Sequence, residues 1–172
     1  MKRRTLIKGS ATALLASSLP KLSLATASAS KSGEPHYDYI LTAEPATAQL
    51  AKSGDTEILG FNGQFPAPVI RAKQGQPLRV KFVNKLDEPS TIHWHGIRLD
   101  IAMDGVPYLT QAPVPAGGSF LYEFTCPDAG TFWYHPHMNS VEQLGKGLVG
   151  ALIVEERERP DYHDVIIGLK DW

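Results

Sequence analysis

Residues 78–86 read LRVKFVNKL, and this stretch decides the fold class. Leu78, Val80 and Phe82 occupy alternate positions, which is the period of two of a half-buried β-strand. Thirteen prolines and 15 glycines divide the rest of the chain into similar short runs. Short strands between Pro and Gly turns predict an all-β protein, an antiparallel Greek-key β-sandwich or barrel. The other β-prone runs are residues 37–51, 56–72, 91–97, 119–126, 130–137 and 149–156.

Two local signals interrupt the strand pattern. Asn62-Gly63 is a dipeptide that favours a tight turn between apolar runs. Residues 140–146, SVEQLGK, predict a helical turn with Ser140 as its N-cap and Gln143 at the capping-box position. A hydrophobic content of 42% and a charged content of 20% are typical of a globular domain with a buried core.

The first 29 residues predict a signal peptide that precedes the fold. A basic start leads into an apolar stretch too short to span a bilayer as a mature helix. Small residues then offer cleavage sites after Ala27 or Ala29. RRTLIK, with its Arg3-Arg4 pair, resembles a twin-arginine signal, which implies export by the twin-arginine machinery to the periplasm. A disordered basic N-terminus is the alternative interpretation.

The chain beyond this segment is acidic. Five of the 17 Lys and Arg residues and none of the 18 acidic residues lie in the first 30 positions, so the remainder has 12 basic residues and a net charge of −6. No basic patch indicates nucleic-acid binding, and no second apolar stretch indicates a membrane anchor after cleavage. Cys126 is the sole cysteine, which excludes a disulfide within this sequence and a CxxC zinc site.

Two histidine dyads, His93-Trp94-His95 and His135-Pro136-His137, carry the chemical signal. Residues i and i+2 of a strand share one face, with Cα atoms about 6.5–7 Å apart. Such pairs reach two neighbouring ions more easily than one, so two facing dyads suit a polynuclear centre. Four imidazoles without a thiolate favour copper or zinc over calcium or magnesium.

The residues around the dyads have simpler predicted roles. Pro136 cannot donate to a ladder, which places the second dyad at a strand end or edge. Gly96 is expected to let the backbone turn away beside the metal. His36 and His163 have no partner in the sequence and are interpreted as ordinary packing or hydrogen-bonding residues. The aromatic neighbours of the dyads are expected to pack in the core; these are Trp94, Trp133 and Tyr134.

Four motifs in this order resemble the first cupredoxin domain of the laccase-like multicopper oxidases. They are HWHG (93–96), MDGVP (103–107), GTFWYHPH (130–137) and GLVGALIVEE (147–156). The resemblance runs from about FNGQFPAPVIRAKQGQ to LKDW. It implies a cupredoxin-like Greek-key fold over residues 37–158.

The resemblance also implies a ligand set. In this family, four histidine-pair motifs hold a cluster of three copper ions. By resemblance, His93 is the type 2 copper ligand, and His95, His135 and His137 are type 3 copper ligands. The type 1 copper site is expected outside this sequence, because Cys126 lacks the flanking histidines of the family's type 1 motif. Cys126 is then expected to be a small buried residue at a strand end.

Asp104 corresponds to the family's acidic residue near the cluster. The reduction of dioxygen to two waters consumes four electrons and four protons, and an acid beside the cluster can relay protons. The alternative interpretation is that Asp104 only shapes an Asp-Gly turn with Gly105.

The expected function is that of a larger protein. Residues 159–172 are interpreted as a linker and the first strand of a truncated second domain, so this sequence is expected to be the inactive front part of an exported oxidase. The expected partners are O2 and a reducing substrate: a phenol, Mn(II) or Cu(I). The three methionines, Met1, Met103 and Met138, form no Met-rich segment, which weakly disfavours Cu(I).

Other classes stay open at this point. One is a copper-binding or copper-tolerance protein without turnover, and another is a copper-free structural relative of the same fold. The presence of all four dyad histidines disfavours the copper-free class. A two-domain nitrite-reductase-like copper protein fits the motifs less well than an oxidase does.

Overall fold

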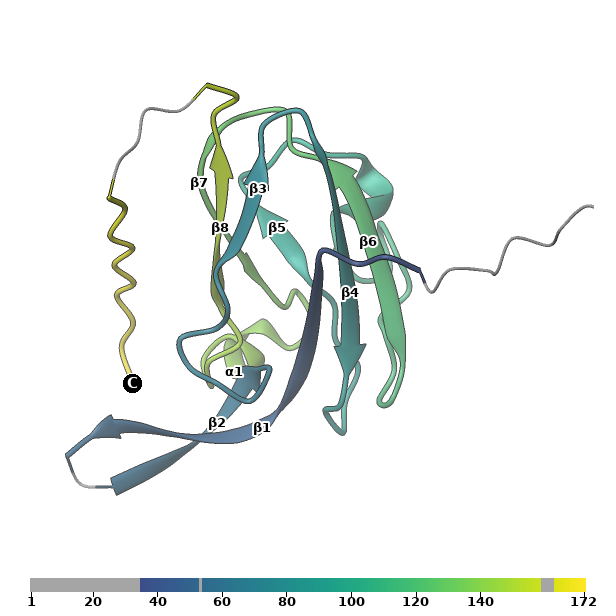
Figure 1. Cartoon of the computed structure of the whole chain (residues 1–172). Coiled ribbons are helices and arrows are strands. Elements are labelled where there is room, and N and C mark those ends of the chain that lie inside the picture. Colours follow the sequence, from purple (N-terminus) through teal and green to yellow (C-terminus); the bar gives the residue numbers. More distant parts are fainter. Residues whose placement is uncertain (1–34, 53, 159–162) are drawn as a thin grey trace, which may run out of the picture. The chain divides into compact units, whose positions relative to one another are not determined.

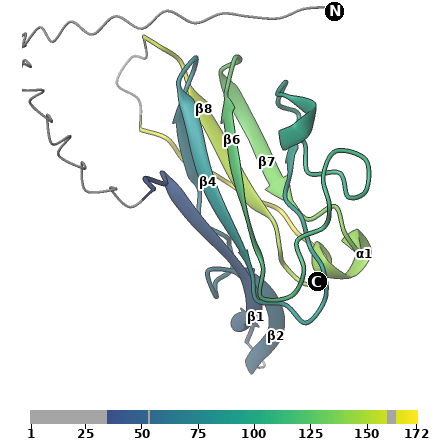
Figure 2. The ribbon, with the colours of Figure 1, turned by 90° about the vertical axis from the view of Figure 1, so that its right-hand side faces the viewer.

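The computed structural model describes residues 35–52, 54–158 and 163–172. Its strands form two packed β-sheets (Figures 1 and 2). The predicted signal peptide lies outside the described residues. One sheet has the strand order β2-β1-β4-β6 and the other β3-β8-β7-β5. Within the described residues the elements are β1 (Tyr39–Ala51), β2 (Gly54–Phe61), β3 (Ile70–Lys73), β4 (Pro77–Asn84), β5 (His93–His95), the 3-10 turn η1 (Ile101–Met103), β6 (Ser119–Thr125), β7 (Gly130–His135), α1 (Ser140–Gln143) and β8 (Gly150–Glu155).

The alternation that predicted β4 is confirmed by its burial. Leu78, Val80 and Phe82 are at most 2% exposed and face the space between the sheets. From the opposite sheet, Trp94 and Tyr134 meet them, and both are fully buried. Burial of each such large apolar side chain contributes about 1.5–3 kcal/mol. The apolar faces of the two sheets therefore form one core.

Each sheet also contains a parallel pair, which the sequence prediction of antiparallel strands did not include. β1 pairs with β4 in parallel, and β3 pairs with β8 in parallel. The chain crosses repeatedly from one sheet to the other, as Figure 1 shows. Strands that enter a sheet after a crossing can run in the same direction as their neighbour. The all-β, two-layer prediction is thus confirmed, and the strand directions are mixed.

Two local predictions had different outcomes. The Asn62-Gly63 turn is present, with φ values of 56° and 68°. The predicted Ser140 cap is wrong, because the N-cap of α1 is Asn139. Asn139 has a left-handed φ of 44° and makes no side-chain cap bond. The chain turns sharply after the second dyad, and this turn sets where α1 begins.

Residues 163–172 form no strand, although the sequence predicts one there. A strand needs a hydrogen-bonded neighbour, and no ladder to this segment exists among the described residues. Side chains attach the segment instead: Asp164 pairs with Arg71 at 3.2 Å, and Trp172 packs edge-on against Phe65 at 5.0 Å between centroids. Separately, none of the described helices has the length and apolar character of a membrane span.

Candidate metal centre

The pairing of β5 with β7 brings the two dyads together. The ladder places His93 opposite His135 and His95 opposite Trp133. Side chains alternate along a strand, so the side chains of His93, His95, Trp133 and His135 lie on one face of the two-stranded ribbon that β5 and β7 form. Trp94 points to the other face and is fully buried in the core. The dyad prediction therefore holds for the placement of the rings.

All four imidazoles converge around His93. Its ring centroid lies 5.5 Å from that of His95, 5.4 Å from that of His135 and 5.3 Å from that of His137. His93, His95 and His135 each offer a nitrogen within 4.8 Å of the others. His137 follows the end of β7 and is exposed, so its ring completes the group from the solvent side.

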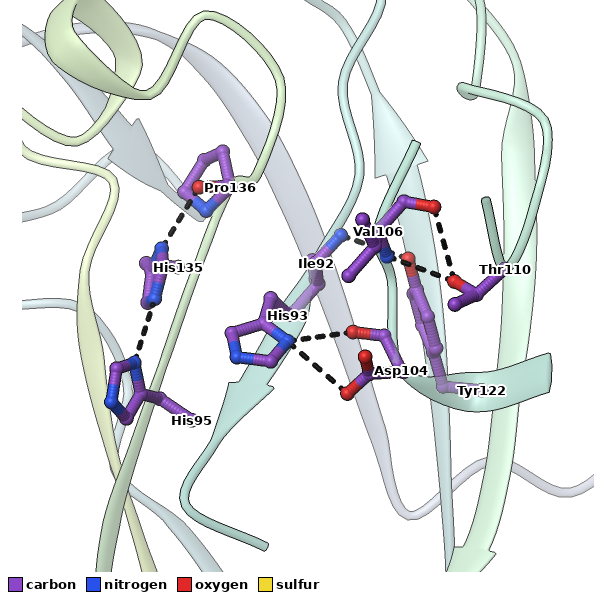
Figure 3. A network of polar contacts seen from close by, with 9 residues as sticks. All are labelled: Ile92, His93, His95, Asp104, Val106, Thr110, Tyr122, His135 and Pro136. Atoms are coloured by element: carbon purple, nitrogen blue, oxygen red, sulfur yellow. Dashed lines mark hydrogen bonds and ion pairs between the residues drawn. The ribbon is translucent and has the colours of Figure 1, made fainter. Parts of the chain in front are cut away.

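One pair of nitrogens has the separation expected for ligands of a single ion. His95 Nδ1 lies 3.3 Å from His135 Nε2 (Figure 3). Two nitrogens bound to one tetrahedral ion at about 2.0–2.1 Å lie roughly 3.3–3.4 Å apart. Imidazole donors without a thiolate suit copper or zinc. The donor set and its spacing therefore fit the copper that the sequence predicts.

Hydrogen bonds orient two of the rings. His93 Nδ1 lies 2.8 Å from the Asp104 carbonyl oxygen and 3.3 Å from the Asp104 carboxylate (Figure 3). His135 Nδ1 lies 2.8 Å from the Pro136 carbonyl oxygen. A ring that donates through Nδ1 presents Nε2 as the metal ligand, and such partners are typical of metal-binding histidines.

The buried position of His135 favours the neutral form of its imidazole. Burial lowers the pKa of His135, and the nearby imidazoles of His93, His95 and His137 lower this pKa further, against an opposing hydrogen bond to Pro136. Metal ions bind the neutral form of histidine. The geometry therefore favours the protonation state that a metal ligand needs.

Two glycines shape the backbone around the first dyad. Gly96 has a φ of +90°, which confirms the predicted turn directly after His95. Gly105 has a φ of +77°, and a Cβ there would lie 1.8 Å from the Ile92 carbonyl oxygen. The loop that carries Asp104 can therefore approach the start of β5 only without a side chain at position 105.

Two buried polar residues support the first dyad from behind, and sequence reasoning missed both. Tyr122 accepts a hydrogen bond from the backbone N–H of Ile92 at 2.8 Å, directly before His93. Burial raises the pKa of Tyr122, so its phenol stays protonated. Tyr122 resembles any aromatic residue of an alternating strand in the sequence, so its hydroxyl gave no separate signal.

Gln143 is the second of these residues, and its predicted role as a capping-box residue is wrong. It is fully buried, and its amide bridges α1 to the segment before β5. Gln143 Oε1 accepts from Ser90 Oγ at 2.8 Å, and Nε2 donates to Glu88 Oε1 at 2.9 Å and to the Pro89 carbonyl at 3.0 Å. The bridge therefore ties the segment after His137 to the segment before His93.

Trp133 does not have the core position that the sequence predicts for it. Trp94 and Tyr134 are fully buried in the core, as expected. Trp133 is half-buried on the same side of β7 as His135 and lies outside the core cluster. Its indole stacks on the imidazoles of His95 and His135, with centroid distances of 4.4 Å and 4.3 Å.

The remaining predicted residues lie away from the dyads. His36 and His163 are exposed and belong to no metal-ligating group in the described part of the chain. Cys126 follows β6 and is fully buried, as expected for a small residue at a strand end. Burial raises the pKa of the Cys126 thiol to about 11. Cys126 is therefore a packing residue of this domain.

Comparisons with known proteins agree on one family. A sequence profile described as multicopper oxidase matches residues 42–159. Laccase-1 of Cryptococcus neoformans var. neoformans serotype D (strain B-3501A) is 42% identical over 127 residues. Copper resistance protein A of Pseudomonas syringae pv. tomato is 39% identical over 117 residues. The crystal structure of a multi-copper oxidase from Pseudomonas Thermotolerans matches with a TM-score of 0.69 and 56% identity.

The coverage of these matches is uneven. They cover 69%, 66% and 70% of this chain, respectively. The same matches cover only 20% and 19% of the two relatives and 30% of the solved chain. The chain thus spans about a fifth of the length of these two relatives.

Proposed function

This chain belongs to the multicopper oxidase family and has its cupredoxin-like fold, and we propose that the whole protein couples the one-electron oxidation of a reducing substrate to the four-electron reduction of O2 to water. The observation that carries the proposal is the convergence of the His95, His135 and His137 rings around the ring of His93. A multicopper enzyme needs such a set, whereas a structural domain gains nothing from four adjacent imidazoles that destabilise one another when protonated.

In the proposed centre, His93 is the type 2 copper ligand, and His95, His135 and His137 are type 3 ligands. The 3.3 Å separation of His95 Nδ1 and His135 Nε2 supports a shared type 3 ion. When bound, copper supplies the one-electron redox chemistry of the centre. The chain itself holds the ligands, keeps His135 neutral and excludes water behind the ribbon. The other ligands and the type 1 site are proposed to lie outside this sequence.

Asp104 is proposed to relay protons toward the centre. Its carboxylate lies 3.3 Å from His93 Nδ1, and its side chain is 31% exposed. A carboxylate that touches both solvent and a ligand ring can pass protons from one to the other. The Asp104 carbonyl also orients the His93 ring. The turn with Gly105 and the relay are therefore compatible roles for one residue.

The reducing substrate is proposed to be a phenol or a metal ion. One relative is named a laccase and another a copper resistance protein, so phenols and Cu(I) both stay candidates beside Mn(II). Residues 1–29 are proposed to direct twin-arginine export to the periplasm, residues 37–158 to form the first domain, and residues 159–172 to lead into the second domain.

Oxygen consumption tests the proposed reaction. The full-length protein, purified with verified copper content, should consume O2 in the presence of a phenol, Mn(II) or Cu(I). His135→Ala should abolish this uptake, and His163→Ala, an exposed histidine outside the centre, should leave it unchanged. A copper-loaded protein that consumes no O2 with any of the three substrates would refute the oxidase function.

A second candidate function is copper tolerance without turnover. The 39% identity to copper resistance protein A favours it. This function predicts that the protein binds copper and protects cells from it, while the copper-loaded protein shows no O2 uptake. The two functions therefore differ in one measurement on the same sample.

A further inference from the structure

Among the described residues, His95 lacks a hydrogen-bond partner of the kind that orients the other two rings. Asp104 holds His93, and the Pro136 carbonyl holds His135. In the described part of the chain, the hydrogen-bond partner of His95 is His135 alone, through the nitrogen that would bind metal. His95 is also exposed, so neighbouring core atoms do not confine it. A ligand ring on a surface strand needs some partner to fix its plane.

The Trp133 indole stacks on the His95 ring. Their planes are 24° apart with centroids at 4.4 Å, and the Trp133–His135 pair has nearly the same geometry, 26° and 4.3 Å. The two imidazole centroids are 5.6 Å apart. Rings stacked on opposite sides of an indole would be at least about 7 Å apart, twice the usual spacing of stacked groups. Both imidazoles therefore lie over the same indole face.

We propose that Trp133 is a positioning residue for the metal centre: its indole face fixes the planes of His95 and His135 so that His95 Nδ1 and His135 Nε2 converge on one ion. This role rests on the metal binding proposed above. Trp133 would orient the His95 ring by stacking, as Asp104 orients the His93 ring by hydrogen bonding. The ladder supports this assignment, because Trp133 is the residue directly opposite His95.

The position of Trp133 shows that it is not an ordinary core-packing residue. Its neighbour Phe132 is also half-buried, but Phe132 packs against the core on the other face of β7. Trp133 packs on two metal-ligating rings and lies outside the core cluster. Phe132 is therefore a matched control, because it lies on the same strand with similar burial and has no ring contact with a histidine in the part of the chain that the structure describes.

The first measurement needs no metal. NMR spectra of the metal-free 172-residue chain should show ring protons of His95 and His135 shifted upfield by the indole. Trp133→Leu should remove these shifts, whereas Trp133→Phe should keep shifts of the same sign. Phe132→Leu should leave both histidines unchanged. Thermal unfolding of each variant verifies that it is folded.

The second measurement is Cu(II) binding to the unaltered chain and to the same three variants. Calorimetry gives the affinity, and the nitrogen hyperfine lines in EPR spectra report the histidine ligands. Trp133→Leu should weaken binding by roughly 10-fold, the lower end of the effect of residues that orient metal ligands, and should reduce the nitrogen hyperfine structure. Trp133→Phe should restore most of the affinity. Phe132→Leu should bind as the unaltered chain does.

The outcomes separate the two proposals. Unchanged histidine shifts or unchanged Cu(II) affinity in a folded Trp133→Leu chain would overturn the positioning role and leave the metal centre standing. Histidine shifts that depend on Trp133, in a chain that binds no Cu(II), would support the ring positioning and refute Cu(II) binding by these four histidines alone.

Discussion

At the scale of single residues, the centre depends on close approaches that only certain side chains allow. The loop that carries Asp104 lies against the carbonyl of Ile92, and Gly105 makes this possible. The same loop brings Asp104 into contact with His93. One glycine therefore determines whether the first dyad has its orienting partner.

Gly105→Ala tests this close approach. Gly117 is the matched control, because its φ of +74° is similar but a Cβ there would have no neighbour within 4 Å. Gly117→Ala should cost about 1–2 kcal/mol, the penalty of a left-handed backbone. Gly105→Ala adds a clash with Ile92 and should cost at least about 3 kcal/mol. Urea unfolding followed by tryptophan fluorescence measures both free energies, and equal costs would contradict the argument.

Cys126 offers a second test at this scale. Its thiol is fully buried, and burial raises its pKa to about 11. The thiolate is the reactive form, so the folded chain should react very slowly with an aromatic disulfide reagent at pH 8. In 8 M urea the reaction should be fast. Rapid labelling of one thiol in the folded chain would show that Cys126 is accessible.

At the scale of elements, β5 is a short strand that needs support. It has three residues and pairs with β7 at the edge of its sheet. The Tyr122 hydroxyl accepts a hydrogen bond from the backbone N–H of Ile92, directly before β5, and Gln143 accepts one from the Ser90 hydroxyl two residues earlier. The dyad on β5 thus keeps its register through side chains from β6 and α1 as well as through the ladder.

Gln143→Leu tests the bridge between α1 and the segment before β5. The change keeps the side-chain size but leaves the buried Ser90 hydroxyl without its Gln143 partner and removes the hydrogen bond to the carbonyl of the exposed Pro89. Unpaired buried groups of this kind should destabilise the fold by about 2–3 kcal/mol. The neighbouring Glu142→Gln affects an exposed ion pair with Lys146 and should leave the urea midpoint almost unchanged. Similar midpoints for both variants would contradict the bridge.

At the scale of the whole molecule, the pairing of β5 with β7 within one sheet brings His95 and His135 together, although they lie 40 residues apart in the sequence. Figure 2 shows the layers edge-on. The core between them is built from both sheets, so the centre depends on global folding rather than on a local loop. The free energy of unfolding of the domain should therefore depend on the ionisation of the buried His135.

The pH dependence of unfolding follows from the lowered pKa of His135. In the unfolded chain this histidine takes up a proton near its ordinary pKa of 6.5, whereas burial disfavours the proton in the folded chain. The unfolded state then binds more protons, so the metal-free chain should lose stability as the pH falls below about 6.5 and show no such loss above it.

His135→Gln isolates this contribution. The unfolding free energy of this variant should fall less between pH 7 and pH 5 than that of the unaltered chain. His163→Gln, which removes an exposed histidine, should keep the full decrease. If the unfolding free energies of the His135 variant and the unaltered chain fell equally between pH 7 and pH 5, His135 would not be the source of the pH dependence.

The extent of prediction differed among elements for identifiable reasons. The strands β4, β6, β7 and β8 were predicted to within one or two residues, because the signals used are local: alternation for β4 and β6, a glycine turn before β7 and an apolar run for β8. The parallel pairing of β1 with β4 was not predicted, because it depends on where the chain crosses between the sheets. The Ser140 cap was wrong because the turn at Asn139 displaces the start of α1.

By itself, the sequence determined the all-β class and the two dyads, since a period of two and paired His-X-His motifs depend only on neighbours along the chain. The tertiary structure alone decided what surrounds the dyads. The stacking of Trp133 on His95 and the bridge from Gln143 to Ser90 join residues that are distant in sequence. Such contacts follow from sheet pairing and crossing, which no local pattern specifies.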